Sequence, residues 1–303
     1  MNKSRRDFIK KTALSYALLS GIPILKIDDM FQENSDNADL SIIVGKDPFH
    51  STKKAIEIIG GIRKFISKGD KVVIKPNIGW ARTPEQAADT NPFVIKAIIE
   101  LCQEAGAASI TVTDRSCQAA AICFSKSGIE DIAKKAGANV LIPSASNFVN
   151  VNLKGSNIKE ASVLKTLIEA DKLINVPIAK HHSLTKLTLG MKNWFGGMGG
   201  QRGTYHKNIH ASIADMAAFF RPHLTVIDGY RILLRNGPIG GNLADVELKS
   251  TIIAGTDPIA ADTLASQLFG ISEKNIPHIM IGEKKGLGTT NINSLKIVKV
   301  SLT

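Results

Sequence analysis

The sequence has little of several features that would place it in a well-defined class. Its 303 residues include three cysteines and no Cys-x-x-Cys pair, so one chain cannot supply a four-cysteine iron–sulfur cluster or zinc site. Aromatic residues make up only 5%, which argues against a stacking platform for single-stranded nucleic acid. No segment reaches about 18 uncharged apolar residues, which excludes a polytopic membrane protein. Walker-type and dinucleotide-binding glycine motifs are lacking too, which disfavours NAD.

Positive charge, in contrast, is in excess. Lysine and arginine number 38 against 27 aspartates and glutamates, which gives a net charge of +11. Part of this charge lies in residues 1–26, and the other lysines are spread along the chain. Such a surface attracts small anions, and the scattered distribution predicts no nucleic-acid partner. A hydrophobic content of 44% is enough to bury a sizeable core.

Residues 1–26 resemble an export signal. Two arginines in Ser4-Arg5-Arg6-Asp7-Phe8 precede a mildly apolar run that ends near Pro23. The pattern is similar to a twin-arginine signal, which implies the twin-arginine export machinery as a partner. The folded protein would then lie in the periplasm or at the outer face of the inner membrane. A basic amphipathic arm is the alternative. Residues 27–39 are polar and acidic and predict a linker before a body over 40–303.

Short β-branched segments alternate with helical patterns throughout this body. The expected strands are 41–44, 71–75, 109–113, 139–142, 172–176, 224–228, 249–254 and 294–300. The expected helices are 51–66, 92–105, 127–136, 160–169, 185–194, 209–220, 258–269 and 272–284. This alternation predicts an α/β fold, a doubly wound, mostly parallel sheet with helices on both faces. A division into two lobes near residue 225 stays open.

Polar and charged side chains follow several of the expected strands. In a parallel sheet the loops at the carboxyl ends of the strands meet at one edge, where ligands bind. We therefore expect the site to draw on the loops after strands 71–75, 109–113 and 172–176. The residues that these loops supply are Lys75, Asn77, Asp114, Arg115, His181 and His182.

The densest group of reactive side chains lies in residues 175–215. His206 and His210 are four apart, which would place two imidazoles on one helical face and suits a shared metal ion. The alternative is a pair of hydrogen-bonded surface histidines. Lys192 lies in an apolar helical pattern, so it is either a desolvated amine with a lowered pKa or a lysine that reaches solvent. The glycine-rich segment 196–203, with Arg202, predicts an anion cradle or a mobile loop.

These residues resemble a family named domain of unknown function 362. The resemblance rests on the Lys75-Pro76-Asn77 turn, on segment 180–196 with its Lys192-Asn193-Trp194-Phe195-Gly196 block, and on segment 254–262. It covers about residues 40–285 and implies a fold more than an activity. The same region is similar, more weakly, to nickel-pincer lactate racemases. That likeness implies Lys192 as the lysine that tethers a cofactor, with His182 and His210 near the metal or substrate.

Together these features predict an enzyme or a cofactor carrier that acts on a small anionic molecule. A noncatalytic periplasmic protein that captures anions is the alternative. The expected catalytic residues are Lys192, His182 and Asp114. The expected substrate-binding residues are Lys75, Asn77, Arg115, Asn193 and Arg202. His181, His206 and His210 are the expected ligands of a metal ion, with nickel, iron or zinc as candidates.

Overall fold

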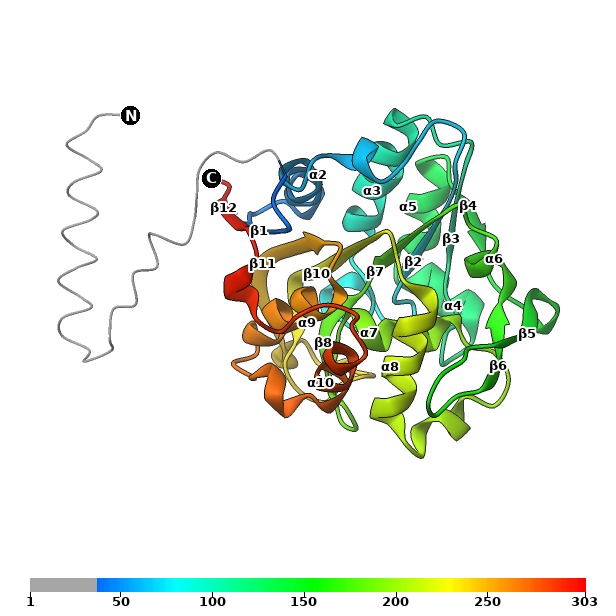
Figure 1. Ribbon diagram of the computed structural model, residues 1–303. Coiled ribbons are helices and arrows are strands. Elements are labelled where there is room, and N and C mark those ends of the chain that lie inside the picture. Colours follow the sequence, from blue (N-terminus) through cyan, green and yellow to red (C-terminus); the bar gives the residue numbers. More distant parts are fainter. Residues whose placement is uncertain (1–36) are drawn as a thin grey trace, which may run out of the picture. The chain divides into compact units, whose positions relative to one another are not determined.

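A ten-stranded sheet organises residues 37–303, the part of the chain that the computed structural model describes. The predicted leader and almost all of the predicted linker lie outside these residues, so their boundaries stay predictions. Eight strands follow one another across the sheet (Figure 1). Their order is β12 (Ile297–Ser301), β1 (Leu40–Val44), β11 (Val246–Gly255), β10 (Leu224–Leu233), β7 (Lys172–Val176), β2 (Lys71–Pro76), β3 (Ser109–Thr113) and β4 (Asn139–Leu141).

Most neighbouring strands in this sheet run parallel. Strand β11 is antiparallel to both β1 and β10, whereas the pairs from β10 through β7, β2 and β3 to β4 are parallel. The predicted mostly parallel α/β fold is therefore confirmed. Strand β10 begins at Leu224 and pairs with β7 and β11, so the sheet is continuous at residue 225. None of the helices in residues 37–303 has the length and apolar run that a membrane crossing requires.

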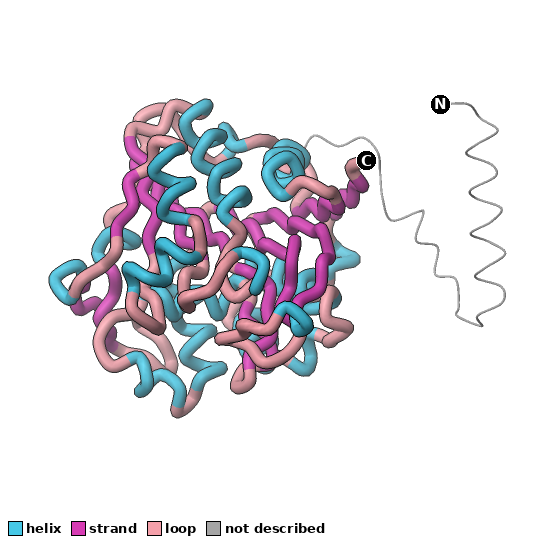
Figure 2. The backbone as a smooth tube through the Cα atoms, turned by 180° about the vertical axis from the view of Figure 1, so that it is seen from behind, coloured by secondary structure: helices cyan, strands magenta, loops and turns pink. Residues whose placement is uncertain are grey.

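Helices cover both faces of the sheet because successive strand residues point to opposite sides. Val72 and Ile74 of β2 enter one buried cluster, and Val73 between them enters the other. Figures 1 and 2 show the strands between the two groups of helices. The first cluster includes side chains from α2 (Pro48–Ile58), α3 (Pro92–Glu104), α4 (Ala120–Lys126) and α5 (Ile129–Lys135). The second includes α6 (Lys165–Ile168), α7 (Gly190–Asn193), α8 (Ile209–Phe220), α9 (Pro258–Gln267) and α10 (Pro277–Lys284).

Three of these helices begin with the same local signal. Asp47, Asn91 and Asp257 each accept a hydrogen bond from the backbone of the first turn of α2, α3 and α9. Each is followed by a proline, whose missing N–H costs nothing at the first helical position. The signal marks the beginning of all three helices in the sequence. The expected helix 51–66 is nevertheless wrong in its bounds, because α2 begins at Pro48 and ends at Ile58.

Two expected helices are largely wrong. Residues 160–169 form strand β6 (Glu160–Leu164), which pairs with β5 (Phe148–Asn152) in a separate two-stranded sheet, and only then the short α6. Ala161 and Val163 are buried, and Ser162 between them is half-buried. Burial at every second residue is the period of a strand. Residues 185–194 form strand β9 (Lys186–Thr188) and then the single turn of α7.

The segment expected as a loop after β7 is also a strand. Strand β8 (Ile178–His182) pairs parallel to β10 and antiparallel to β9. Its alternation buries Lys180 and His182 on one side and directs His181 to the other. The strand is difficult to recognise in the sequence because it contains Lys180, His181 and His182, and charged residues ordinarily indicate an exposed loop. The strand carries them into the interior, beside the site.

Candidate functional site

An open cleft of about 400 Å³ lies where the carboxyl ends of β2 and β3 meet strand β8 and helix α7. This volume falls in the range of small-molecule sites, and the position is the one expected for ligands of parallel sheets. The structure brings eight of the eleven predicted site residues to its lining. They are Asn77, Asp114, Arg115, His182, Lys192, Asn193, Arg202 and His206.

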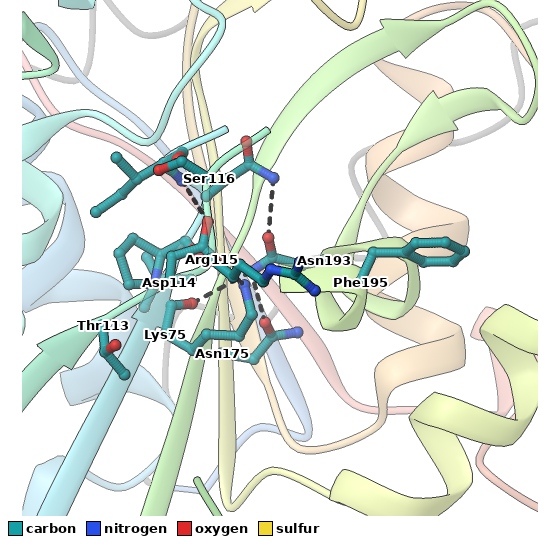
Figure 3. Close-up of polar contacts among 12 residues, drawn as sticks. Lys75, Thr113, Asp114, Arg115, Ser116, Asn175, Asn193 and Phe195 are labelled. Atoms are coloured by element: carbon teal, nitrogen blue, oxygen red, sulfur yellow. Dashed lines mark hydrogen bonds and ion pairs between the residues drawn. The ribbon is translucent and has the colours of Figure 1, made fainter. Parts of the chain in front are cut away.

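A buried ion pair lies below the cleft. Lys75, the penultimate residue of β2, has its Nζ 2.6 Å from Oδ1 of Asp114, which follows β3. The other carboxylate oxygen accepts the backbone N–H of Ile78 at 2.7 Å. Burial lowers the pKa of Lys75, and the attraction of Asp114 opposes that shift. Both oxygens of Asp114 are thus engaged in holding the strand ends together (Figure 3), which points to a positioning role.

Gly196 lets the main chain approach this ion pair. A Cβ atom at this position would overlap Oδ1 of Asp114 and crowd Nζ of Lys75. The backbone carbonyl of Gly196 also accepts the N–H of Arg115 at 2.9 Å. The glycine-rich segment therefore provides a close approach, as expected, but to a charged pair of the protein itself.

A directed chain of side-chain amides crosses the floor of the cleft. Lys180 donates to Asn77 at 2.9 Å, and Asn77 donates to Asn193 at 3.0 Å. Asn193 in turn donates to Asn175 at 2.9 Å, and Asn175 donates to the carbonyl of Gly190 at 2.9 Å. Figure 3 shows Asn175 and Asn193 within this chain. Because every link has one donor and one acceptor, the chain fixes the single turn of α7, on which Lys192 is carried.

Lys180 brings a second buried charge close to the floor. Its ammonium also donates to the carbonyl of Ala88. Burial lowers the pKa of Lys180, whereas the nearby carboxylate of Asp89 raises it. Burial likewise raises the pKa of Asp89 to about 7, against the attraction of Lys180. The carboxylate of Asp89 accepts the backbone N–H of Trp80 at 3.0 Å, which holds the loop after β2 at the cleft.

Lys192 is the unusual group of the cleft. Its side chain is 7% exposed, and its ammonium lies 3.7 Å from the centre of the Phe195 ring. Among residues 37–303 it makes no hydrogen bond and no ion pair. Burial lowers the pKa of Lys192 to about 7; the cations Lys180 and Arg202 act in the same direction, and Cys117 opposes them. About half of the amine is therefore neutral near physiological pH.

Two arginines line the cleft without a carboxylate partner in the described part of the chain. Arg115 donates to the carbonyls of Met198 and Gly200 at 2.9–3.1 Å. Arg202 donates to the carbonyls of Arg115 and Ser116 at 2.8 and 2.7 Å. Burial lowers the pKa of Arg115, and repulsion from Arg202 lowers it further. Carbonyl oxygens orient the two guanidinium groups but leave their charge uncompensated, which favours an anionic ligand.

His182 lines the cleft as a neutral ring. The backbone N–H of Leu184 donates to its Nδ1 at 3.1 Å, so the proton of the neutral ring is on Nε2. Burial, followed by the charge of Lys192, lowers the pKa of His182 to about 3. We therefore interpret His182 as a hydrogen-bond donor to a ligand, whereas the sequence pattern predicts it as a catalytic residue.

The three histidines expected to bind a metal ion do not share one site. The shared helical face is wrong, because α8 begins at Ile209 and His206 precedes it in a 3₁₀ turn. His206 packs its ring against Phe195, whereas His210 stacks on His278 with their Nδ1 atoms 3.0 Å apart. His181 accepts the backbone N–H of Gly237 on the other side of β8. Within residues 37–303 no three His, Cys, Asp or Glu side chains are placed to hold a metal ion together.

Four residues of the site were not predicted from the sequence: Lys180, Asn175, Asp89 and Trp80. Lys180 and His182 are two residues apart, so reading 178–182 as a strand would have placed both on one face. Asn175 lies within an otherwise apolar strand, and a polar residue in such a strand is a usable signal. Asp89 and Trp80 carry no local signal, because their roles arise from contacts between distant segments.

Known proteins of two kinds are similar to this chain. A thylakoid-associated protein of Synechocystis sp. is 24% identical over 248 residues, which cover 79% of this chain and 75% of that protein. The lactate racemase apoprotein from Thermoanaerobacterium thermosaccharolyticum has a TM-score of 0.42 and 14% sequence identity. That comparison covers 75% of this chain, which spans 56% of the racemase chain.

A family model agrees with the resemblance seen in the sequence. The model is described as a domain of unknown function, DUF362, and it matches residues 72–267. The match runs from β2 through α9 and contains every residue that lines the cleft. The chain therefore belongs to the DUF362 family.

Proposed function

We propose that this protein is an enzyme that binds a small organic anion in the cleft and acts on it through the neutral amine of Lys192. The observation that carries the proposal is the state of Lys192, buried without a polar partner among the described residues and with its pKa lowered to about 7. An amine of this kind is a base or a nucleophile near neutral pH. The amine also lines the open cleft, where a ligand can reach it.

The other lining residues suit the binding of an anion next to this amine. Arg115 and Arg202 provide charge that no carboxylate of the described chain neutralises, and His182 offers its Nε2–H as a neutral donor. A carboxylate held by the guanidinium groups would bring an adjacent carbonyl or acidic C–H to the lysine. The amine would then add to the carbonyl carbon, or take up the proton, without first losing one of its own.

Reductive trapping tests the nucleophile directly. Pyruvate and cyanoborohydride should label Lys192: its nitrogen adds to the ketone carbon, water leaves as the imine forms, and hydride from the reagent reduces the C=N bond. Pyruvate is intrinsically the more reactive ketone, so the preference is measured against the exposed Lys186 in the same sample. We expect the ratio of pyruvate to acetone labelling at Lys192 to exceed that at Lys186 by at least about ten-fold. Peptide mass spectrometry identifies the labelled lysine.

Two variants control this experiment. Lys192→Met should abolish the adduct, whereas Lys186→Met removes an exposed lysine outside the cleft and should leave it unchanged. Arg202→Leu should reduce the preference for pyruvate over acetone. The same ratio of pyruvate to acetone labelling at Lys192 and Lys186, or labelling confined to surface lysines, would contradict the proposal.

The unpaired arginines also favour a second candidate function, noncatalytic capture of an anion. In that case pyruvate or another small carboxylate should raise the thermal stability of wild type and of Lys192→Met equally, with no adduct in either. An enzyme instead requires the lysine for turnover or adduct formation. The Lys192→Met variant alone therefore distinguishes the two functions.

We also propose that the protein acts after export by the twin-arginine route, in the periplasm or at the outer face of the inner membrane. The paired arginines of Ser4-Arg5-Arg6-Asp7-Phe8 and the mildly apolar run after them support this proposal. That route carries proteins that have already folded, so the cleft would form before export.

A further inference from the structure

The cleft is lined by apolar as well as by charged side chains. Its cations include Lys192, Arg115 and Arg202, which we call the charged floor. Three apolar side chains from three other segments line the same cleft, in addition to the ring of Phe195. Trp80 follows β2, Leu184 lies at the tip of the β8–β9 hairpin, and Pro238 belongs to the connection between β10 and β11. We call these three residues the apolar rim.

Leu184 is the most informative member of the apolar rim. It is 59% exposed although it sits at a hairpin tip, where polar residues and glycine are preferred. A single exposed leucine needs no explanation, but three apolar side chains around one charged cleft form a local surface with its own preference. Burying Leu184 against an apolar group of a ligand would remove that surface from water.

Hydrogen bonds between the segments hold the apolar rim in place. Gly237, next to Pro238, donates to Nδ1 of His181 at 3.1 Å. Arg82 and Gln86, beyond Trp80, donate to the carbonyls of Gly240 and Gly241 at 3.3 and 2.8 Å. The loop after β2, strand β8 and the β10–β11 connection are thereby joined around the opening. Because these loops are already ordered, a ligand that binds against the apolar rim does not lose further loop entropy.

From this arrangement we propose that the substrate is amphiphilic: an organic anion whose charged end meets Lys192 and the arginines and whose apolar chain or ring lies against the apolar rim. The inference rests on the proposed function and adds the substrate class to it. The charge complementarity of the floor sets the orientation, and the apolar rim sets the length and hydrophobicity of the far end.

A series of straight-chain carboxylates measures the apolar rim separately from the charged floor. Binding of butanoate, hexanoate and octanoate to the full chain is followed by titration calorimetry. For wild type we expect the Kd to fall by up to about four-fold for each added methylene that reaches the rim. Leu184→Ser should bind butanoate as wild type does, but gain less than about two-fold per methylene.

Leu248→Ser is the matched control, because Leu248 is 57% exposed and does not line the cleft. It should keep the wild-type gain per methylene. If wild type binds all three carboxylates with one Kd, the amphiphilic substrate is wrong while the anion site stands. If none of them binds, the proposed anion site itself fails.

A membrane surface is the other occupant that a charged cleft with an apolar rim could meet. Vesicles of phosphatidylglycerol test this outcome by co-sedimentation. If Leu184→Ser lowers vesicle binding but leaves the carboxylate series unchanged, the apolar rim docks on lipid and the proposed substrate class is overturned. If vesicle binding is the same for wild type and Leu184→Ser, the rim serves the soluble ligand.

Discussion

Replacing Lys192 with methionine should make the protein more stable at about pH 6. Methionine has a similar shape and no charge, so it removes an ammonium that is largely desolvated, at the wall of the cleft, and has no polar partner in the described residues. The folded pKa of about 7 and the ordinary value of 10.5 imply an upper limit of about 5 kcal/mol for this penalty. The lost contact with the Phe195 ring offsets about 1–2 kcal/mol of the gain.

The sign of the pH dependence follows from the lowered pKa. Between pH 7 and 10.5 the unfolded state binds more protons at Lys192 than the folded state, so this group makes stability rise with pH in that window. The advantage of Lys192→Met should therefore be largest below pH 7 and shrink as the pH rises. Denaturant unfolding of both proteins across this range measures it.

Lys186→Met is the control, because Lys186 is exposed and its removal should change stability by less than about 0.5 kcal/mol at every pH. A Lys192→Met protein that is less stable than wild type at low pH would mean that the ammonium has a partner. A gain in stability on removing the Lys192 amine is expected for a functional residue, because active-site groups often reduce the stability of the fold.

Removing one member of the Lys75–Asp114 pair should have the largest destabilising effect. Asp114→Asn keeps an oxygen for the backbone N–H of Ile78 but leaves the Lys75 ammonium without its charge partner, in a fully buried position. We expect a loss of about 3–5 kcal/mol in the free energy of unfolding. Lys75→Met alone should also destabilise, because it strands the carboxylate of Asp114.

The double variant Lys75→Met/Asp114→Asn distinguishes an ion pair from two independent structural roles. If the charges stabilise each other, the double variant should recover most of the loss, and the coupling free energy should exceed about 2 kcal/mol. Additive losses would contradict the pairing. Urea unfolding of the four proteins completes the cycle.

The overall architecture could be predicted from sequence because its signals are local. Lys71-Val72-Val73-Ile74 is an apolar run typical of a strand covered on both faces, and Asp257-Pro258 marks the beginning of α9. Lys75, Asn77, Asp114 and Arg115 were placed near one another because parallel strand ends meet at one edge of the sheet. The cleft contains Asn77, Asp114 and Arg115, and Lys75 lies beneath them.

One physical cause of the departures from prediction is that the fold buries polar residues. The segment that forms β8 is predicted as a loop because it contains Lys180 and His182. Burying a charge is unfavourable unless a partner compensates it, so such residues are expected at the surface. The compensating groups, Asn77 and Asp89, lie about a hundred residues earlier in the chain. For His206 and His210 the spacing was misleading, because the helix begins between them. A short stretch of sequence does not reveal partners that lie far away along the chain, nor the residue at which α8 begins.

The state of Lys192 is the claim on which the proposed chemistry depends, and the pH dependence of its reactivity measures it most directly. Wild-type protein is alkylated with formaldehyde and cyanoborohydride over a series of pH values, and peptide mass spectrometry follows Lys192 and the exposed Lys186 in the same samples. The account predicts that the rate at Lys192 reaches its half-maximum at about pH 7, far below the ordinary lysine value of 10.5. Superimposed profiles for the two lysines would show that Lys192 is an ordinary ammonium, and would contradict the account.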